Sequence, residues 1–195
     1  MAAAEESRRQ FVISVMAWDR VGIVSQVSEA VASMGGDIAD LRQQVLRNYL
    51  TMIIYASFPA GVDRQTVEER LQLLGGEGRD ALAVQVREIG GVLPEQSRVG
   101  QEDLYVLTAQ GPNRIGFVAA VSGFCAENRI NILDLYTTES PEGGSYTMIL
   151  LVDTSGCPSM EEVRRNMKAF AEQKGLSLVL QHYDIFRATN EIRIF

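Results

Sequence analysis

Two short stretches of this 195-residue chain have the residue types of an anion site. Residues 19–24 read Asp-Arg-Val-Gly-Ile-Val, and residues 113–118 read Asn-Arg-Ile-Gly-Phe-Val. Each stretch follows an apolar, strand-like run and opens an amphipathic, helix-like run, which predicts a strand-to-helix turn. The free amides and the positive end of the helix dipole at such a turn favour a carboxylate.

The polar and glycine residues of these two corners allow more than one role. Asp19 and Asn113 are good N-cap residues, and a cap would account for both without any ligand. Glycine is a poor helix former, so Gly22 and Gly116 require another explanation. Either a ligand approaches the backbone there, or the glycine packs closely against a facing strand.

Further polar side chains lie beside the corners and at the start of the second strand of each half. Arg20 and Arg114 could reach a carboxylate, or they could simply be solvated. Asn131 offers both a donor and an acceptor for an amino acid, whereas the ionised Asp37 at the matching position only accepts. Two sites built on these residues would therefore differ in chemistry.

The corners belong to an internal repeat. Asp19 and Asn113 are 94 positions apart, while Thr51 and Thr147 are 96 apart, so two residues are inserted between the second and third apolar runs of the second half. The insertion falls around residues 141–144 and predicts a longer hairpin loop than the turn in the first half.

Each half has the pattern strand, helix, strand, strand, helix, strand. In the first half the strands are expected at residues 11–18, 37–46, 50–58 and 83–88, and the helices at 21–34 and 64–74. In the second half they are expected at 104–110, 131–139, 145–153 and 177–186, with helices at 115–127 and 159–174. This order predicts an α+β fold of two ferredoxin-like βαββαβ domains, each with helices on one face of an antiparallel sheet.

The domain boundaries follow from composition. We expect a flexible N-terminus (1–10), a first domain (11–90), a linker (91–103), a second domain (104–187) and a C-terminal extension (188–195) that adds an edge strand or covers a sheet face. The third strands are apolar on both sides, so the helix-free sheet faces are expected to be partly buried by a neighbouring domain or chain.

Composition argues against several functions. The net charge of −7, without a basic stripe, disfavours direct nucleic-acid binding, and no apolar run is long enough for a membrane span. Two isolated cysteines fit a reducing, cytoplasmic location, although the short N-terminal extension leaves an organellar address open. The single histidine, His182, lies at an apolar strand position, and no catalytic, metal-binding or cofactor-binding set is evident. We therefore expect neither an enzyme nor a cofactor.

These motifs resemble those of a known family. Asp-Arg-x-Gly-Ile-Val, followed by Met34-Gly35-Gly36 and Asp37-Ile38, resembles the ACT domain, a ferredoxin-like module that binds amino acids in metabolic regulation. Two such domains without a catalytic domain are similar to the glycine cleavage system transcriptional repressor family. The resemblance implies that an effector lies between the corner of one domain and the second-strand start of a neighbour, with sheets joined side by side. By position it implicates Asp19, Arg20, Gly22, Asp37, Ile38, Asn113, Arg114, Gly116, Asn131 and Ile132.

The function implied is that of a non-catalytic regulator. It would bind an amino-acid effector, with glycine and serine as first candidates, form a homodimer, and signal through a protein partner that is a transcription regulator or a metabolic enzyme. The alternatives are a ligand-free interaction module and a regulatory subunit of a separate metabolic enzyme. Asp37 departs from the asparagine usual in the family, so the corner at Asn113, together with Asn131, is the better-equipped site.

Overall fold

The computed structural model describes residues 8–90, 100–140 and 143–189. The chain divides into two compact units, one on each side of residues 91–99. Most of the expected linker and of the two terminal segments therefore lies outside the described residues. The first strand begins at Arg8, three residues before the expected start at Phe11.

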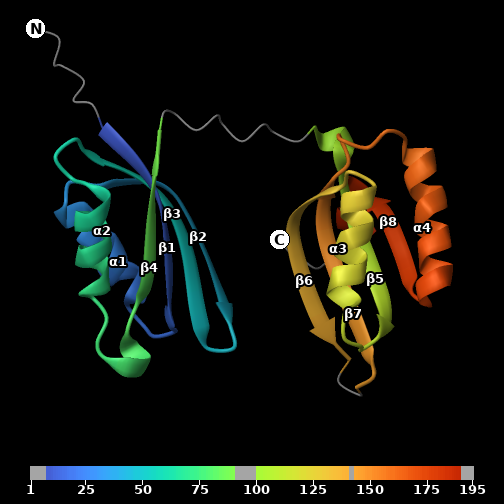
Figure 1. The fold of residues 1–195 in the computed structure, drawn as a ribbon, viewed down its shortest axis with the longest axis horizontal. Coiled ribbons are helices and arrows are strands. Elements are labelled where there is room, and N and C mark those ends of the chain that lie inside the picture. Colours follow the sequence, from blue (N-terminus) through green and yellow to red (C-terminus); the bar gives the residue numbers. More distant parts are fainter. Residues whose placement is uncertain (1–7, 91–99, 141–142, 190–195) are drawn as a thin grey trace, which may run out of the picture. The chain divides into compact units, whose positions relative to one another are not determined.

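The first domain has the predicted element order (Figure 1). Its elements are β1 (Arg8–Trp18), α1 (Ile23–Ser33), β2 (Asp37–Leu46), β3 (Tyr49–Pro59), α2 (Arg64–Gln72), the 3-10 helix η1 (Gly78–Asp80) and β4 (Ala83–Ile89). The strands form an antiparallel sheet in the order β2-β3-β1-β4. Helices α1 and α2 cover one face of this sheet.

The second domain repeats this topology with the order β6-β7-β5-β8. Its elements are the 3-10 helix η2 (Gln101–Asp103), β5 (Leu104–Pro112), α3 (Phe117–Glu127), β6 (Asn131–Glu139), β7 (Ser145–Asp153), α4 (Met160–Lys174), β8 (Ser177–His182) and α5 (Tyr183–Thr189). Two antiparallel four-stranded sheets with crossover helices confirm the predicted pair of ferredoxin-like α+β domains.

Each core lies between a sheet and its two crossover helices. Alternate residues of the central strands point inward, as in Phe11, Ile13 and Val15 of β1, because successive side chains of a strand alternate between its faces. The helices contribute the apolar stripes that their spacing predicted, among them Val27 and Val31 in α1. Val121 and Cys125 occupy the matching positions in α3.

The two hairpins differ in length, as the insertion predicted. Arg47 and Asn48 have positive φ values of 47° and 69°, which is the backbone of a tight two-residue turn. The second hairpin turns between Ser140 and Ser145, and its loop includes residues 141 and 142, which lie outside the described residues.

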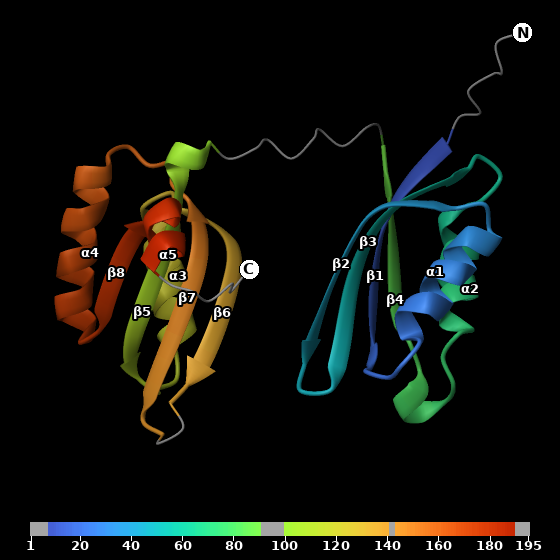
Figure 2. The ribbon, with the colours of Figure 1, turned by 180° about the vertical axis from the view of Figure 1, so that it is seen from behind.

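The expected strand at 177–186 is wrong at its end. Strand β8 stops at His182, and residues 183–189 form α5. In Figure 2, α5 lies in front of the sheet, whereas α3 lies behind it. There Phe186 is buried, and Val106, which points to this face, is only 1% exposed. A short apolar run fits either a strand or one helical face, so periodicity alone could not separate the two.

The sheet faces opposite the crossover helices thus differ between the two domains. In the second domain, α5 covers part of this face. In the first domain no helix covers it among the described residues, and Met16 and Ile53 on it are 48% and 60% exposed. Burial of the first face by a neighbouring chain stays a prediction. Thr189 ends α5, and the rest of the C-terminal extension, whose strand or cover role was left open, lies outside the described residues.

Candidate functional site

The two corners share one backbone conformation. Helix α1 begins after Gly22 (φ 89°, ψ −4°) and helix α3 after Gly116 (φ 88°, ψ 3°), both in the left-handed region. A Cβ atom placed on either glycine would meet no atom within 4 Å. Close packing against a facing strand is therefore the wrong explanation for these glycines. The backbone itself requires them, because other residues enter this region at a cost.

The predicted N-cap role of Asp19 and Asn113 is wrong. The N-cap positions are the glycines, three residues later, and neither α1 nor α3 has a side-chain capping hydrogen bond. Asn113 instead donates from Nδ2 to Oε1 of Glu139, at 2.8 Å. The Asp19 side chain is exposed.

The other crossover helix of each domain is capped. Asp63 accepts a hydrogen bond from the Thr66 amide at 2.8 Å at the start of α2, and Ser159 accepts one from the Glu162 amide at 3.4 Å at the start of α4. At the corners the first helical amides, those of Ile23 and Phe117, donate to the carbonyl oxygens of Arg20 and Arg114 at 3.4 and 3.2 Å. The second and third helical amides there have no side-chain cap.

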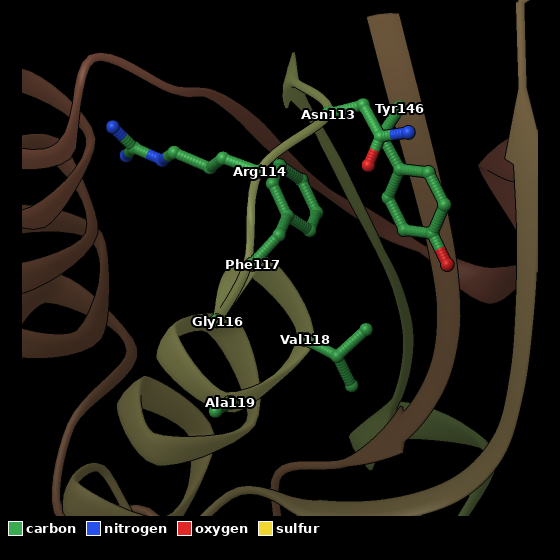
Figure 3. Close-up of a pocket in the computed structure, with 7 residues that line it drawn as sticks. All are labelled: Asn113, Arg114, Gly116, Phe117, Val118, Ala119 and Tyr146. Atoms are coloured by element: carbon green, nitrogen blue, oxygen red, sulfur yellow. The ribbon is translucent and has the colours of Figure 1, made fainter.

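A pocket of about 320 Å³ opens at the start of α3. It is lined by Asn113, Arg114, Gly116, Phe117, Val118, Ala119 and Tyr146 (Figure 3). The Phe117 and Tyr146 rings meet edge to face at 5.3 Å and form an aromatic wall. Val118 and Ala119 are the second and third residues of α3, whose amides have no acceptor within the helix. The pocket therefore combines an apolar wall with the N-terminus of α3, which is the positive end of the helix dipole.

The two arginines have local partners. Arg114 donates from Nη2 to the carbonyl oxygen of Lys174, the last residue of α4, where the helix leaves carbonyl groups unpaired. Figure 3 shows its side chain extending away from Asn113 and Tyr146. Arg20 donates from Nη2 to Oε1 of Gln26 at 2.7 Å. Neither guanidinium is held in this structure as an anion ligand.

The second-strand residues lie far from the corner of their own domain. Asn131 pairs with Asp153 at the end of the sheet where β5 begins, whereas the corner follows the other end of β5. The 9-residue strand β6 separates these ends, which at the usual rise is about 26 Å. Asp37 and Ile38 stand in the same relation to Gly22 in the first domain. One domain therefore does not bring the two predicted residue groups together.

Sequence reasoning missed two residues at the second corner, Glu139 and Tyr146. They are direct cross-strand partners on β6 and β7, and the counterparts in the first domain are Val45 and Leu50. The sequence did not reveal that Glu139 lies near Asn113, because that proximity follows from the register between β6 and β7.

Metal-ligating side chains are scattered over the described residues. No group of three or more His, Cys, Asp or Glu residues is placed to hold a metal ion there. Burial raises the pKa of Cys125 to about 11, and burial also raises the pKa of Cys157, so both thiols stay protonated near neutral pH. No helix in the described part of the chain is long and apolar enough to cross a membrane.

Comparison with known proteins identifies the class. Residues 9–79 and residues 105–167 each match a family model described as an ACT domain. The chain therefore belongs to the ACT-domain family and carries two ACT domains in tandem.

Two relatives each match slightly less than half of this chain. A UPF0237 protein of Neisseria meningitidis serogroup A is 41% identical over 91 residues, which are 45% of this chain and 96% of that protein. A UPF0237 protein of Clostridium perfringens is 32% identical over 88 residues, 45% of this chain and 97% of that protein.

Two solved structures share the fold of nearly the whole chain. An unknown protein from Galdieria sulphuraria has a TM-score of 0.69 and 24% identity, covering 90% of this chain and 98% of its own. A proposed glycine cleavage system transcriptional repressor has a TM-score of 0.67 and 19% identity, covering 89% and 96%. At these identities the likeness concerns the fold. Membership of the ACT family indicates a regulatory protein that binds a small molecule.

Proposed function

We propose that this protein is a non-catalytic regulator that binds an amino acid at the corner of its second domain. The observation that carries the proposal is the contrast between helix starts. Helices α2 and α4 are capped by side chains, whereas α3 starts at an uncapped left-handed glycine beside a pocket of about 320 Å³. The carboxylate of the effector would accept hydrogen bonds from the amides of Val118 and Ala119.

The rest of the binding site comes from a neighbouring copy. Asn131 and Ile132 lie at the opposite end of their own sheet, so they would reach the corner of another chain in a homodimer. Asn131 and Ile132 lie on β6, which is an edge strand of its sheet (Figure 1). An edge strand can pair with the edge of another sheet, which joins the two sheets side by side. Asp37 and Ile38 would play this role toward Asp19, Arg20 and Gly22 in the first domain.

Glycine and serine are the effectors to test first. The pocket lining includes two small residues, Gly116 and Ala119, and the motifs resemble those of the glycine cleavage system transcriptional repressor family. The signal would pass to a protein partner, a transcription regulator or a metabolic enzyme, in the cytoplasm. The net charge of −7 argues against direct contact with nucleic acid.

A ligand-free interaction module is the second candidate. The exposed Met16 and Ile53 on the helix-free face of the first sheet favour it, because apolar patches of this kind mark protein contacts. Such a module could also be the regulatory subunit of a separate enzyme. Its partner would then bind with no dependence on any amino acid.

Calorimetric titration of the full chain with the twenty amino acids distinguishes these functions. We expect wild type to bind one amino acid or a few. In Ala119→Pro the affinity should fall at least about tenfold, because proline has no amide hydrogen to donate to the ligand carboxylate. The first turn of a helix tolerates proline. Ser25→Pro, at the same position of α1, removes the matching amide of the first corner and should leave binding at the second-domain corner unchanged. Thermal melting of both variants checks that they fold. Absence of heat or of a thermal shift with every amino acid would refute the proposal.

A further inference from the structure

Glu139 stands at the rim of the second-domain pocket without being part of its lining. It is the last residue of β6 and lies directly opposite Tyr146 of β7. Directly paired residues of antiparallel strands project to the same face, with Cβ atoms about 5 Å apart. The Glu139 side chain therefore leaves the sheet on the same face as Tyr146, whose ring walls the pocket.

The hydrogen bond between Glu139 and Asn113 fixes the polarity of this rim. Asn113 donates from Nδ2 to Oε1 of Glu139 at 2.8 Å, so the nitrogen end of its amide faces Glu139. The other end of the amide, Oδ1, is an acceptor, and Figure 3 shows it on the side of Phe117. The Glu139 carboxylate and Oδ1 of Asn113 are thus two acceptors at this rim, and one of the two amide hydrogens of Asn113 is already donated to Glu139.

The first domain has no equivalent of the Glu139 carboxylate on its hairpin strand. Val45 and Leu50 replace Glu139 and Tyr146 in the paired positions of β2 and β3. Val45 is half exposed and offers no polar atom. The left-handed glycine is common to both corners, and the exposed carboxylate of Asp19 stands at the first corner where Asn113 stands at the second. The carboxylate on the hairpin strand, Glu139, belongs to the second alone.

We infer that Glu139 determines the chemical class of the ligand, selecting an α-amino acid over a 2-hydroxy acid of the same shape. The inference rests on the proposed function. The ligand carboxylate lies at the amide end of the pocket, and its ammonium donates to the Glu139 carboxylate and to Oδ1 of Asn113. A hydroxyl in place of the ammonium carries no charge, so it forms the weaker neutral hydrogen bond.

The test compares Glu139→Gln with wild type, using glycine against glycolate and serine against glycerate as probes. Glutamine keeps the size of the side chain and an acceptor oxygen but removes the charge. Wild type should bind the amino acid of a pair at least about tenfold more tightly than the hydroxy acid. In Glu139→Gln the affinity for the amino acid should fall about tenfold while that for the hydroxy acid is unchanged.

The matched control is Val45→Gln, which adds the same side chain at the equivalent position of the first domain and should leave both affinities unchanged. Equal melting temperatures of the three proteins exclude a folding defect. Unchanged amino-acid affinity in Glu139→Gln, or an equal loss for both ligands of a pair, would overturn the role of Glu139 and leave the proposed function standing. If wild type binds neither amino acid, the role of Glu139 fails for these probes, and the titration with all twenty decides the proposed function separately.

Discussion

At the first corner the side chains around the left-handed glycine are Asp19, Val45 and Leu50, whereas at the second they are Asn113, Glu139 and Tyr146. The backbone is the same to within a few degrees at Gly22 and Gly116. This difference teaches that the fold supplies a helix start with free amides twice, while the neighbouring hairpin places different side chains beside each start. The two domains are therefore one scaffold with two chemistries.

The largest difference between the domains should appear at alkaline pH. Cys125 in the core of the second domain replaces Val31 in the first, and burial raises its pKa from 9.0 to about 11. Its contribution to stability is complete below pH 9 and is lost as the pH rises toward 11, because the unfolded state releases the proton first. The second domain should lose about 2 to 3 kcal/mol.

Denaturant unfolding measures this loss domain by domain. Trp18, the single tryptophan of the chain, reports on the first domain by fluorescence, while circular dichroism reports on both. In Cys125→Val the pH-dependent difference between the domains should shrink. A variant that keeps the full alkaline loss would show that other groups cause it.

Replacing the corner glycines tests their shared backbone. Gly22→Ala and Gly116→Ala should each destabilise their domain by about 1 to 2 kcal/mol, since alanine is strained in the left-handed region. Gly123→Ala is the control within α3, where a Cβ also meets nothing within 4 Å and φ is not positive; there alanine should stabilise by about 0.5 to 1 kcal/mol. Unequal losses at the two corners would break the structural equivalence of the domains.

The smallest effects separate capped from uncapped helix starts. Asp63→Ala and Ser159→Ala should each cost about 1 kcal/mol, because each removes a helix cap. Asp19→Ala and Asn113→Ala should each cost less than about 0.5 kcal/mol in the absence of ligand, as exposed residues usually do. Urea midpoints measure all four changes, and a cost at Asp19 as large as that at Asp63 would restore the capping role.

The sequence predicted the fold because its signals were redundant. Two copies of one strand and helix pattern constrain each other, and the stripes at Val27 and Val31 or Val121 and Cys125 could bury only one helix face. It failed where the signal was short. Residues 183–186 continue the chain after β8, and in the structure they form the start of α5, which contacts β5 and β8.

At the candidate site the sequence alone located both corners, their glycines and the chemical inequality of the two halves. It could not decide why Gly22 and Gly116 are glycine, since a positive φ and a close contact require the same residue. It also could not find Glu139 beside Asn113, because their proximity depends on the pairing of β6 with β7. Local composition determined which elements form and where amides are left free. Only the tertiary structure decided which distant side chains meet them, because strand register and hairpin length are set by the packing of the whole sheet.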